Sequence, residues 1–312
     1  MNARPRALVV LNPAAHGGTG ARRFEAISPA VASRLDATIV LGRADAAWIG
    51  EVHSALARGV RVFVSAGGDG TAHALLNALI DAPGRPPLAS LTLGAIGLGS
   101  SNDLLKPVRT RIDRVPVRLD LASAAPRDVV RCRYVGETAS RTECFLVSAS
   151  LGVTACANAR FSEEAPVARW LRKVSTPLAI ACAAARTVAA WRDLPAELQT
   201  DGGAPELVEL CSLNVLKTEW VSGRFHLGHP IAADSGELDI ALVADSDRLS
   251  LVADLLALLR GRFDGRPGHR FLRARSLDVR LQKETPLELD GEIERVRAVR
   301  FDLYPERICV CG

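Results

Sequence analysis

The sequence predicts an α/β domain followed by a β-rich domain, and three observations support this. Up to about residue 120, apolar strand-like runs alternate with stretches of helical periodicity, which is typical of a parallel sheet covered by helices. Polar, glycine-rich loops follow three of these strands. After about residue 120, short strand-like runs are separated by turn residues, which favours an all-β domain with inserted helices.

Each element of the first domain follows from its apolar pattern. Near-continuous apolar runs predict strands buried on both faces, as parallel strands are. Apolar residues spaced to share one face predict the helices between them. The predicted strands are 6–11, 37–41, 60–65 and 91–96, and the predicted helices are 20–35, 46–58 and 71–80.

The second domain is predicted from shorter strands that turn residues separate. We place the boundary so that 1–122 form the α/β domain and 123–312 the β-rich domain, with a final strand compatible with packing back on the first domain. The predicted strands are 128–135, 144–150, 207–215, 238–243, 276–281, 287–289 and 296–303, and the helical inserts are 165–192 and 249–262.

Composition narrows the class of protein. A hydrophobic content of 48% with 24% charged residues is typical of a soluble globular chain. No apolar stretch approaches the ~18 residues of a membrane span, and the N-terminal apolar run is too short for a signal peptide. The seven cysteines show no C-x-x-C spacing, which favours reduced thiols over a metal site. We therefore expect a cytoplasmic protein without a transmembrane segment.

The charge pattern argues against nucleic-acid binding and leaves two explanations for the excess of arginine over lysine. The net charge is +4, and no basic tail or basic-aromatic array indicates nucleic-acid binding. Only four of the 39 basic residues are lysines. This dominance of arginine is compatible with phosphate handling and equally with genomic base composition.

The segment Gly67-Gly68-Asp69-Gly70-Thr71 joins a predicted strand directly to a predicted helix. Glycines allow a close approach of the backbone, and amides at a helix N-terminus favour anions such as phosphate. Asp69 would repel phosphate, so its presence implies a cation, most readily Mg²⁺, or a role in orienting another group. The alternative is a tight turn in which Asp69 and Thr71 cap the helix.

Three polar loops follow the carboxyl ends of predicted strands. They begin at Asn12, Gly67 and Gly97. In parallel sheets ligands gather beyond the carboxyl ends of strands, so we expect the three loops to converge on one edge.

Four segments together resemble the diacylglycerol kinase catalytic family, which includes bacterial lipid kinases and sphingosine and ceramide kinases. They are N-P-A-A-H-G-G-T-G at 12–20, G-G-D-G-T at 67–71, G-L-G-S-S-N-D at 97–103 and L-D-G-E at 289–292. The resemblance spans nearly the whole chain. It implies a Rossmann-like α/β domain of the NAD kinase/diacylglycerol kinase type, a C-terminal β-sandwich domain, and an active site between the two.

The resemblance also implies a set of nucleotide-binding residues, with ATP and Mg²⁺ as cofactors. Ser100 stands where the family usually has threonine and keeps a hydroxyl. Arg22 and Arg23 follow the first loop and could neutralise phosphate charge, although a solvated helix face is the more common role for at least one of them. The implied contacts are Asn12, Pro13, His16, Gly17, Gly67, Gly68, Gly70, Thr71, Ser100, Asn102 and Asp103, with Asp69 in a catalytic role.

The segment Asp290-Gly291-Glu292 matches the part of the family that activates the lipid hydroxyl. A general base must reach the hydroxyl proton at hydrogen-bond distance. We assign Glu292 as the proton acceptor and Asp290 as a residue that orients it or contacts Mg²⁺, and the reverse assignment stays open. The alternative is an ordinary hairpin, because Asp-Gly is a favoured turn pair.

The chain departs from the family pattern at several positions. Ala74 stands where a glutamate is common, and Gly97 replaces the usual proline. Ser235 replaces a carboxylate of the family's structural metal loop, where Asp234 or Glu237 could compensate. No clear threonine follows the second strand, where the chain reads V-L-G-R at 40–43.

The resemblance therefore implies an ATP-dependent kinase that phosphorylates a hydroxyl of a diacylglycerol-like or sphingoid lipid at a membrane surface. Two alternatives are a soluble phosphotransferase of the NAD-kinase type and a catalytically silent lipid- or nucleotide-binding homologue. The basic-aromatic segment 168–173, with Trp191 and Trp220, could contact the inner membrane surface, although burial of Trp170 in a core is the more common outcome. The sequence carries no signal for the lipid headgroup or for the oligomeric state.

Overall fold

The computed structural model describes residues 4–43, 45–136, 140–162, 186–223 and 225–312. The chain divides into two compact units, Met1–Val129 with Tyr304–Gly312 and Val130–Leu303. The C-terminal strand therefore belongs to the first unit. Most of the segment 165–192, which was predicted to be helical, lies outside the described residues, as do Trp170 and its neighbours. No helix in the described ranges is long and apolar enough to cross a membrane.

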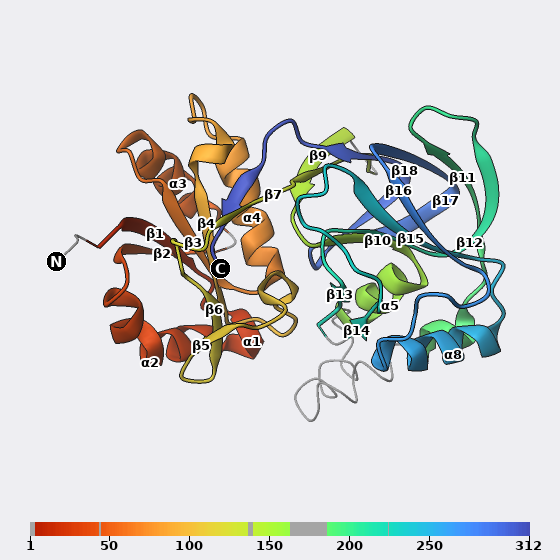
Figure 1. Cartoon of the computed structure of the whole chain (residues 1–312), viewed down its shortest axis with the longest axis horizontal. Coiled ribbons are helices and arrows are strands. Elements are labelled where there is room, and N and C mark those ends of the chain that lie inside the picture. Colours follow the sequence, from red (N-terminus) through yellow and green to blue (C-terminus); the bar gives the residue numbers. More distant parts are fainter. Residues whose placement is uncertain (1–3, 44, 137–139, 163–185, 224) are drawn as a thin grey trace. The chain divides into compact units, whose positions relative to one another are not determined.

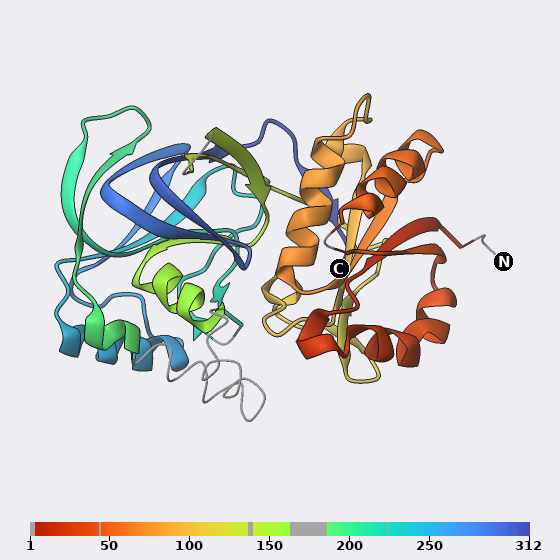
Figure 2. The ribbon, with the colours of Figure 1, turned by 180° about the vertical axis from the view of Figure 1, so that it is seen from behind.

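The first unit is a mixed sheet with helices on both faces (Figures 1 and 2). Four parallel strands run in the order β2-β1-β3-β4, so the direction of the connections reverses at β1 and β3. A ligand site is expected at such a switch point. The strands are β1 (Arg6–Leu11), β2 (Asp36–Leu41), β3 (Val62–Gly67), β4 (Thr92–Gly97), β5 (Thr110–Ile112), β6 (Val115–Arg118), β7 (Ala125–Arg127) and β19 (Ile308–Val310).

The helices of this unit begin and end close to the predicted positions. Helix α4 starts two residues before the predicted Thr71, because Gly68 provides the extended residue that precedes it. The elements are α1 (Ala15–Gly18), α2 (Gly20–Ala32), α3 (Ala47–Ala57) and α4 (Asp69–Ile80), with the 3₁₀ turns η1 (Leu88–Ser90) and η2 (Asp103–Leu105).

Burial explains the order of the strands. β1, β3 and β4 are buried along nearly their whole length, whereas β2 is an edge strand with several exposed residues. The far edge of β4 is shared: β19 pairs with its beginning, and β6 pairs antiparallel with its end. The central strands are therefore fixed on both sides, and their carboxyl ends are rigid places for loops.

The second unit is a nine-stranded antiparallel sheet, counted over the described residues, that curves around one apolar core (Figure 1). The strands β10 and β11 share the space between β12 and β17, one after the other along their length. This confirms the predicted β-sandwich type of domain with inserted helices. Its elements are β8 (Val130–Val135), β9 (Ser140–Phe145), β10 (Ser148–Gly152), α5 (Val153–Ser162), β11 (Leu194–Thr200), β12 (Glu206–Leu216), β13 (Trp220–Val221), β14 (Phe225–His226), β15 (Leu238–Ala244), α8 (Arg248–Leu259), β16 (His269–Ala274), β17 (Ser276–Leu289) and β18 (Glu292–Leu303).

Candidate functional site

The glycine-rich loop after β3 is shaped by close contacts. A Cβ atom added at Gly67 would lie 2.2 Å from the hydroxyl oxygen of Thr71, so no larger residue fits there. Gly68 is extended and caps the N-terminus of α4. The glycines of this loop have no positive φ, so at Gly67 the close contact with Thr71, rather than a left-handed conformation, requires glycine.

Asp69 joins this loop to the loop that follows β4. Its Oδ2 accepts the backbone N–H of Asp103 and its Oδ1 accepts that of Leu104, both at 3.0 Å. A carboxylate that receives two N–H groups is a strong link, because hydrogen bonds to charged groups are stronger than neutral ones. Asp69 therefore positions the neighbouring loop, which agrees with the orienting role that the sequence left open beside a cation contact.

Asn12 connects the first loop to the glycine-rich loop after β3. Its backbone N–H donates to Ala66 at 2.9 Å, and its side-chain Nδ2 donates to the Thr71 hydroxyl at 3.3 Å. Its Oδ1 accepts the N–H of Ala14. Beyond it, His16 and Gly17 have positive φ values of 51° and 68° and form an exposed left-handed bend.

The loop after β4 lies directly against the loop after β3. The N–H groups of Leu98 and Gly99 both donate to the carbonyl of Gly67, at 2.8 and 2.9 Å. A Cβ atom at Gly99 would lie 2.4 Å from the Cα of Gly68, so the two backbones touch. Asn102, in the left-handed region, closes the loop by accepting from the N–H of Gly99 and donating to its carbonyl.

Two cations lie beside these loops. The Arg23 guanidinium donates to the carbonyl of Leu98 at 2.9 Å, whereas Arg22 is exposed. Lys106 forms a 2.7 Å ion pair with the buried Asp103. Of the two arginines singled out in the sequence, Arg23 is thus the one held at the glycine loops.

The departure at Gly97 has a steric reason. A Cβ atom there would lie 2.6 Å from Leu105 and 2.7 Å from Pro116, which leaves no room for a proline ring. Of the other predicted contacts, Ser100 is exposed and Pro13 is half-buried. All three predicted loops therefore meet at the carboxyl ends of β1, β3 and β4, as expected for a parallel sheet.

In the second unit, Asp290 and Gly291 form the two-residue turn between β17 and β18. Their φ values are 48° and 98°, and Leu289 pairs with Glu292 across the turn. Two successive residues with positive φ are typical of a tight hairpin, and Asp-Gly is a preferred sequence for it. The segment is therefore a hairpin turn, and the hydrogen bonds of its acidic side chains show which further roles it can have.

The carboxylate of Asp290 is buried, at 3% exposure, and collects backbone N–H groups from the turn between β9 and β10. Its Oδ2 accepts from Leu146 at 3.1 Å, and its Oδ1 accepts from Val147 and Ser148, both at 3.0 Å. Three N–H donors fix the position of this carboxylate. No sequence pattern pointed to these partners, which lie more than 140 residues away.

A second buried carboxylate supports the hairpin, and the third acidic residue is exposed. Glu288 accepts from the Ser150 hydroxyl and from the N–H of Gly291, both at 2.7 Å. Sequence reasoning missed Glu288, which lies at the end of β17, two residues before Asp290. Glu292 is exposed at the start of β18, and its carboxylate has no hydrogen-bond partner within the described ranges.

An ammonium group from another part of the chain binds the predicted metal loop at 234–237. Lys217 donates from Nζ to the hydroxyl of Ser235 at 3.0 Å and to the backbone carbonyl of Glu237 at 2.6 Å. Asp234 is exposed. Within the part of the chain that the structure describes, no group of three or more His, Cys, Asp or Glu side chains could hold a metal ion. The ammonium of Lys217 therefore binds oxygen atoms of the loop to which the sequence assigned a metal.

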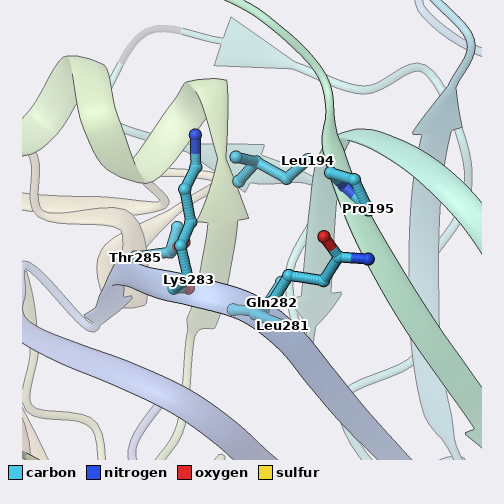
Figure 3. A pocket seen from close by; sticks show the side chains of 6 residues that line it. All are labelled: Leu194, Pro195, Leu281, Gln282, Lys283 and Thr285. Carbon is cyan, nitrogen blue, oxygen red and sulfur yellow. The ribbon is translucent and has the colours of Figure 1, made fainter.

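A cavity of about 300 Å³ lies in the second unit, where β17 is irregular and β11 begins. Figure 3 shows its lining of apolar and polar side chains, with Lys283 extended along it. The lining residues are Leu194, Pro195, Leu281, Gln282, Lys283 and Thr285. None of them belongs to the glycine loops or to the hydrogen-bond network of the D-G-E hairpin.

Family models match both parts of the chain. Residues 6–130 match the diacylglycerol kinase catalytic domain. Residues 148–312 match the YegS C-terminal NAD kinase beta sandwich-like domain. Among curated proteins, none matches the sequence significantly.

Solved structures share the fold at low sequence identity. A diacylglycerol kinase from Bacillus anthracis str. Sterne is 16% identical with a TM-score of 0.64, over 100% of this chain and 97% of that one. A further structure from the same organism gives a TM-score of 0.70 at 18% identity, over 100% of this chain and 98% of that one. Yeast NADH kinase complexed with NADH has a TM-score of 0.51 at 10% identity, over 100% of this chain and 84% of that one. At such identities the likeness concerns the fold alone.

Proposed function

The chain belongs to the diacylglycerol kinase catalytic-domain family, and we propose that it transfers the γ-phosphate of ATP to a hydroxyl of a diacylglycerol-like or sphingoid lipid. The observation that carries the proposal is the meeting of three glycine-rich loops at the carboxyl ends of β1, β3 and β4. Asp69, Asn12 and Asn102 hold these loops through hydrogen bonds. Phosphoryl transfer requires mainly positioning and charge neutralisation, and rigid backbone loops supply the first.

The glycine loops suit a polyphosphate for two reasons. Where a Cβ atom has no room, as at Gly67 and Gly99, the ligand meets backbone rather than side chains. The N-terminus of α4 adds the partial positive charge that favours an anion. In this proposal Arg23 neutralises part of the phosphate charge from its place beside Leu98.

Asp69 suits a role next to Mg²⁺. Magnesium is commonly held by one or two carboxylates together with phosphate oxygens, so a single well-placed aspartate is enough. When bound, Mg²⁺ would neutralise the phosphate oxygens and withdraw charge from the leaving group. The two backbone N–H groups that bind Asp69 would keep its carboxylate in place for that contact.

We assign the proton acceptor of the lipid hydroxyl to Glu292. Asp290 already accepts three backbone N–H groups, which commits most of its lone pairs. Glu292 is exposed at the end of the same rigid hairpin and is free to take a proton onto its carboxylate. In this assignment the hydroxyl proton passes to Glu292 while the oxygen bonds to the γ-phosphorus, and ADP leaves as the bond between that phosphorus and the β,γ-bridging oxygen breaks. Asp290 positions the hairpin.

A lipid acceptor places the reaction at a membrane surface. We infer that the protein acts from the cytoplasm on a substrate in the inner membrane. Part of the cavity of the second unit is compatible with an acyl chain, because Leu194, Pro195 and Leu281 line it beside the polar side chains. Lipid identity depends on pocket shape and is left to experiment.

The test is a transfer assay with purified protein, labelled ATP and a panel of acceptors. Diacylglycerol, ceramide and sphingosine in mixed micelles are compared with NAD. Label in a lipid supports the proposal, and label only in NAD would replace it with an NAD-kinase activity. ATP binding without transfer to any acceptor would identify a silent homologue.

A further inference from the structure

Lys217 is a buried lysine at the end of β12. It is 1% exposed and is among the largest fully buried side chains of the described residues. A buried ammonium is unfavourable unless oxygen atoms surround it, because it loses its water. The partners of Lys217 should therefore show why the chain keeps a charge there.

The partners are oxygen atoms of the loop at 234–237. The ammonium donates to the Ser235 hydroxyl at 3.0 Å and to the Glu237 carbonyl at 2.6 Å. Ser235 further binds Glu237, whose N–H donates to the hydroxyl oxygen at 3.3 Å. Hydroxyl and carbonyl oxygens on a tight loop are also the kind of ligands that hard divalent cations take. Here the cation at the loop is part of the protein.

The same lysine is connected to the D-G-E hairpin. Its backbone N–H donates to the carbonyl of Val147 at 2.9 Å. The N–H of Val147 in turn donates to the carboxylate of Asp290 at 3.0 Å. One residue thus links the loop at 234–237 to the turn that fixes Asp290.

We propose that the ammonium of Lys217 takes the place of a divalent cation in the 234–237 loop, so that this side of the second unit is held together without a bound metal. Two cations at hydrogen-bond distance from the same oxygens would repel each other strongly in a buried place. The serine at 235 fits this arrangement, because a neutral hydroxyl satisfies an ammonium that already has a carbonyl partner. The inference is independent of the reaction that the protein catalyses.

The first measurement uses the unmodified full-length protein without nucleotide. Its Tm is compared in EDTA and in millimolar Mg²⁺ or Ca²⁺. We expect the two values to agree within about 1 °C, because no site for the metal exists in the loop. A rise of several degrees that disappears in Asp234→Ala would place a metal in the loop and overturn the proposal.

The second measurement compares two lysines. Lys217→Met should lower the Tm by about 4–8 °C, because it leaves the oxygens of Ser235 and Glu237 without their buried donor. The matched control Lys283→Met changes an exposed lysine in the same unit and should leave the Tm unchanged. Equal Tm values for the two variants would contradict the role of Lys217.

A third variant replaces the ammonium of Lys217 with a possible metal ligand in the loop. Lys217→Ala combined with Ser235→Asp removes the ammonium and supplies a carboxylate. We expect its Tm to rise by about 5 °C or more on adding Mg²⁺ or Ca²⁺, and to fall again in EDTA. Absence of a response would contradict the claim that ammonium and metal occupy the same place.

Discussion

Gly99→Ala tests whether the contact between two glycine loops makes the nucleotide site. The added methyl group would lie 2.4 Å from the Cα and 3.0 Å from the N of Gly68. Ordinary contact begins near 3.4 Å, so the loops must separate by about 1 Å. Such a shift moves both backbones away from the positions in which Leu98 and Gly99 donate to the Gly67 carbonyl.

The size of the effect follows from these distances. Overpacking of this kind costs about 1–3 kcal/mol, and the two hydrogen bonds to the Gly67 carbonyl oppose the separation. About 2 kcal/mol corresponds to a Tm lowered by roughly 4–8 °C. A displaced N–H group that loses a charged phosphate partner weakens ATP binding by a further ~1.5–3 kcal/mol, which is about tenfold to a hundredfold.

The assay is calorimetric titration with Mg-ATP together with a thermal melt. The matched control is Gly50→Ala on helix α3, where a methyl group meets nothing within 4 Å. That variant should gain about 0.4–1 kcal/mol of stability, because alanine restricts the unfolded chain, and it should bind ATP normally. If Gly99→Ala binds ATP as tightly as the unmodified protein, the loop contact does not form the site.

Three further predictions concern carboxylates. Asp69→Asn replaces one of two oxygens that accept backbone N–H groups, so ATP affinity should fall about tenfold to a hundredfold in the same titration; unchanged affinity would remove Asp69 from the site. Glu292→Gln should lower turnover by about a hundredfold or more and leave the ATP Kd unchanged, whereas equal loss of both would indicate a structural turn. The hydrogen bond from Arg85 lowers the pKa of Glu306, so this carboxylate stabilises the fold above its unfolded pKa of about 4.3 and loses that effect as the pH falls through the folded value. Glu306→Gln should therefore lower the Tm at pH 7 and make little difference near pH 3. If the variant and the unmodified protein differ in Tm by the same amount at both pH values, the ion pair does not have this role.

Much of the candidate site could be predicted from the sequence because its signals are local. A buried strand, a glycine cluster and a helix follow each other within a few residues at Gly67–Thr71, and parallel topology brings the neighbouring loops to the same edge. The hairpin that the Asp-Gly pair left open as an alternative is also present. In these cases short-range preference and the final structure agree.

The remaining features depend on partners far apart in the sequence. Asp290 looked like a catalytic or turn residue, but its carboxylate also holds the turn between β9 and β10. Lys217 lies in an apolar strand pattern that says nothing about which loop its ammonium reaches. Side-chain hydrogen bonds of this range are set by tertiary packing, which no local pattern encodes.

The most direct measurement of the central claim compares ATP labelled at the γ-phosphate with ATP labelled at the α-phosphate, each incubated with the protein and lipid micelles. The account predicts organic-soluble label from the γ-labelled nucleotide and none from the α-labelled one. Label that stays wholly in ATP and inorganic phosphate across the lipid panel would contradict it.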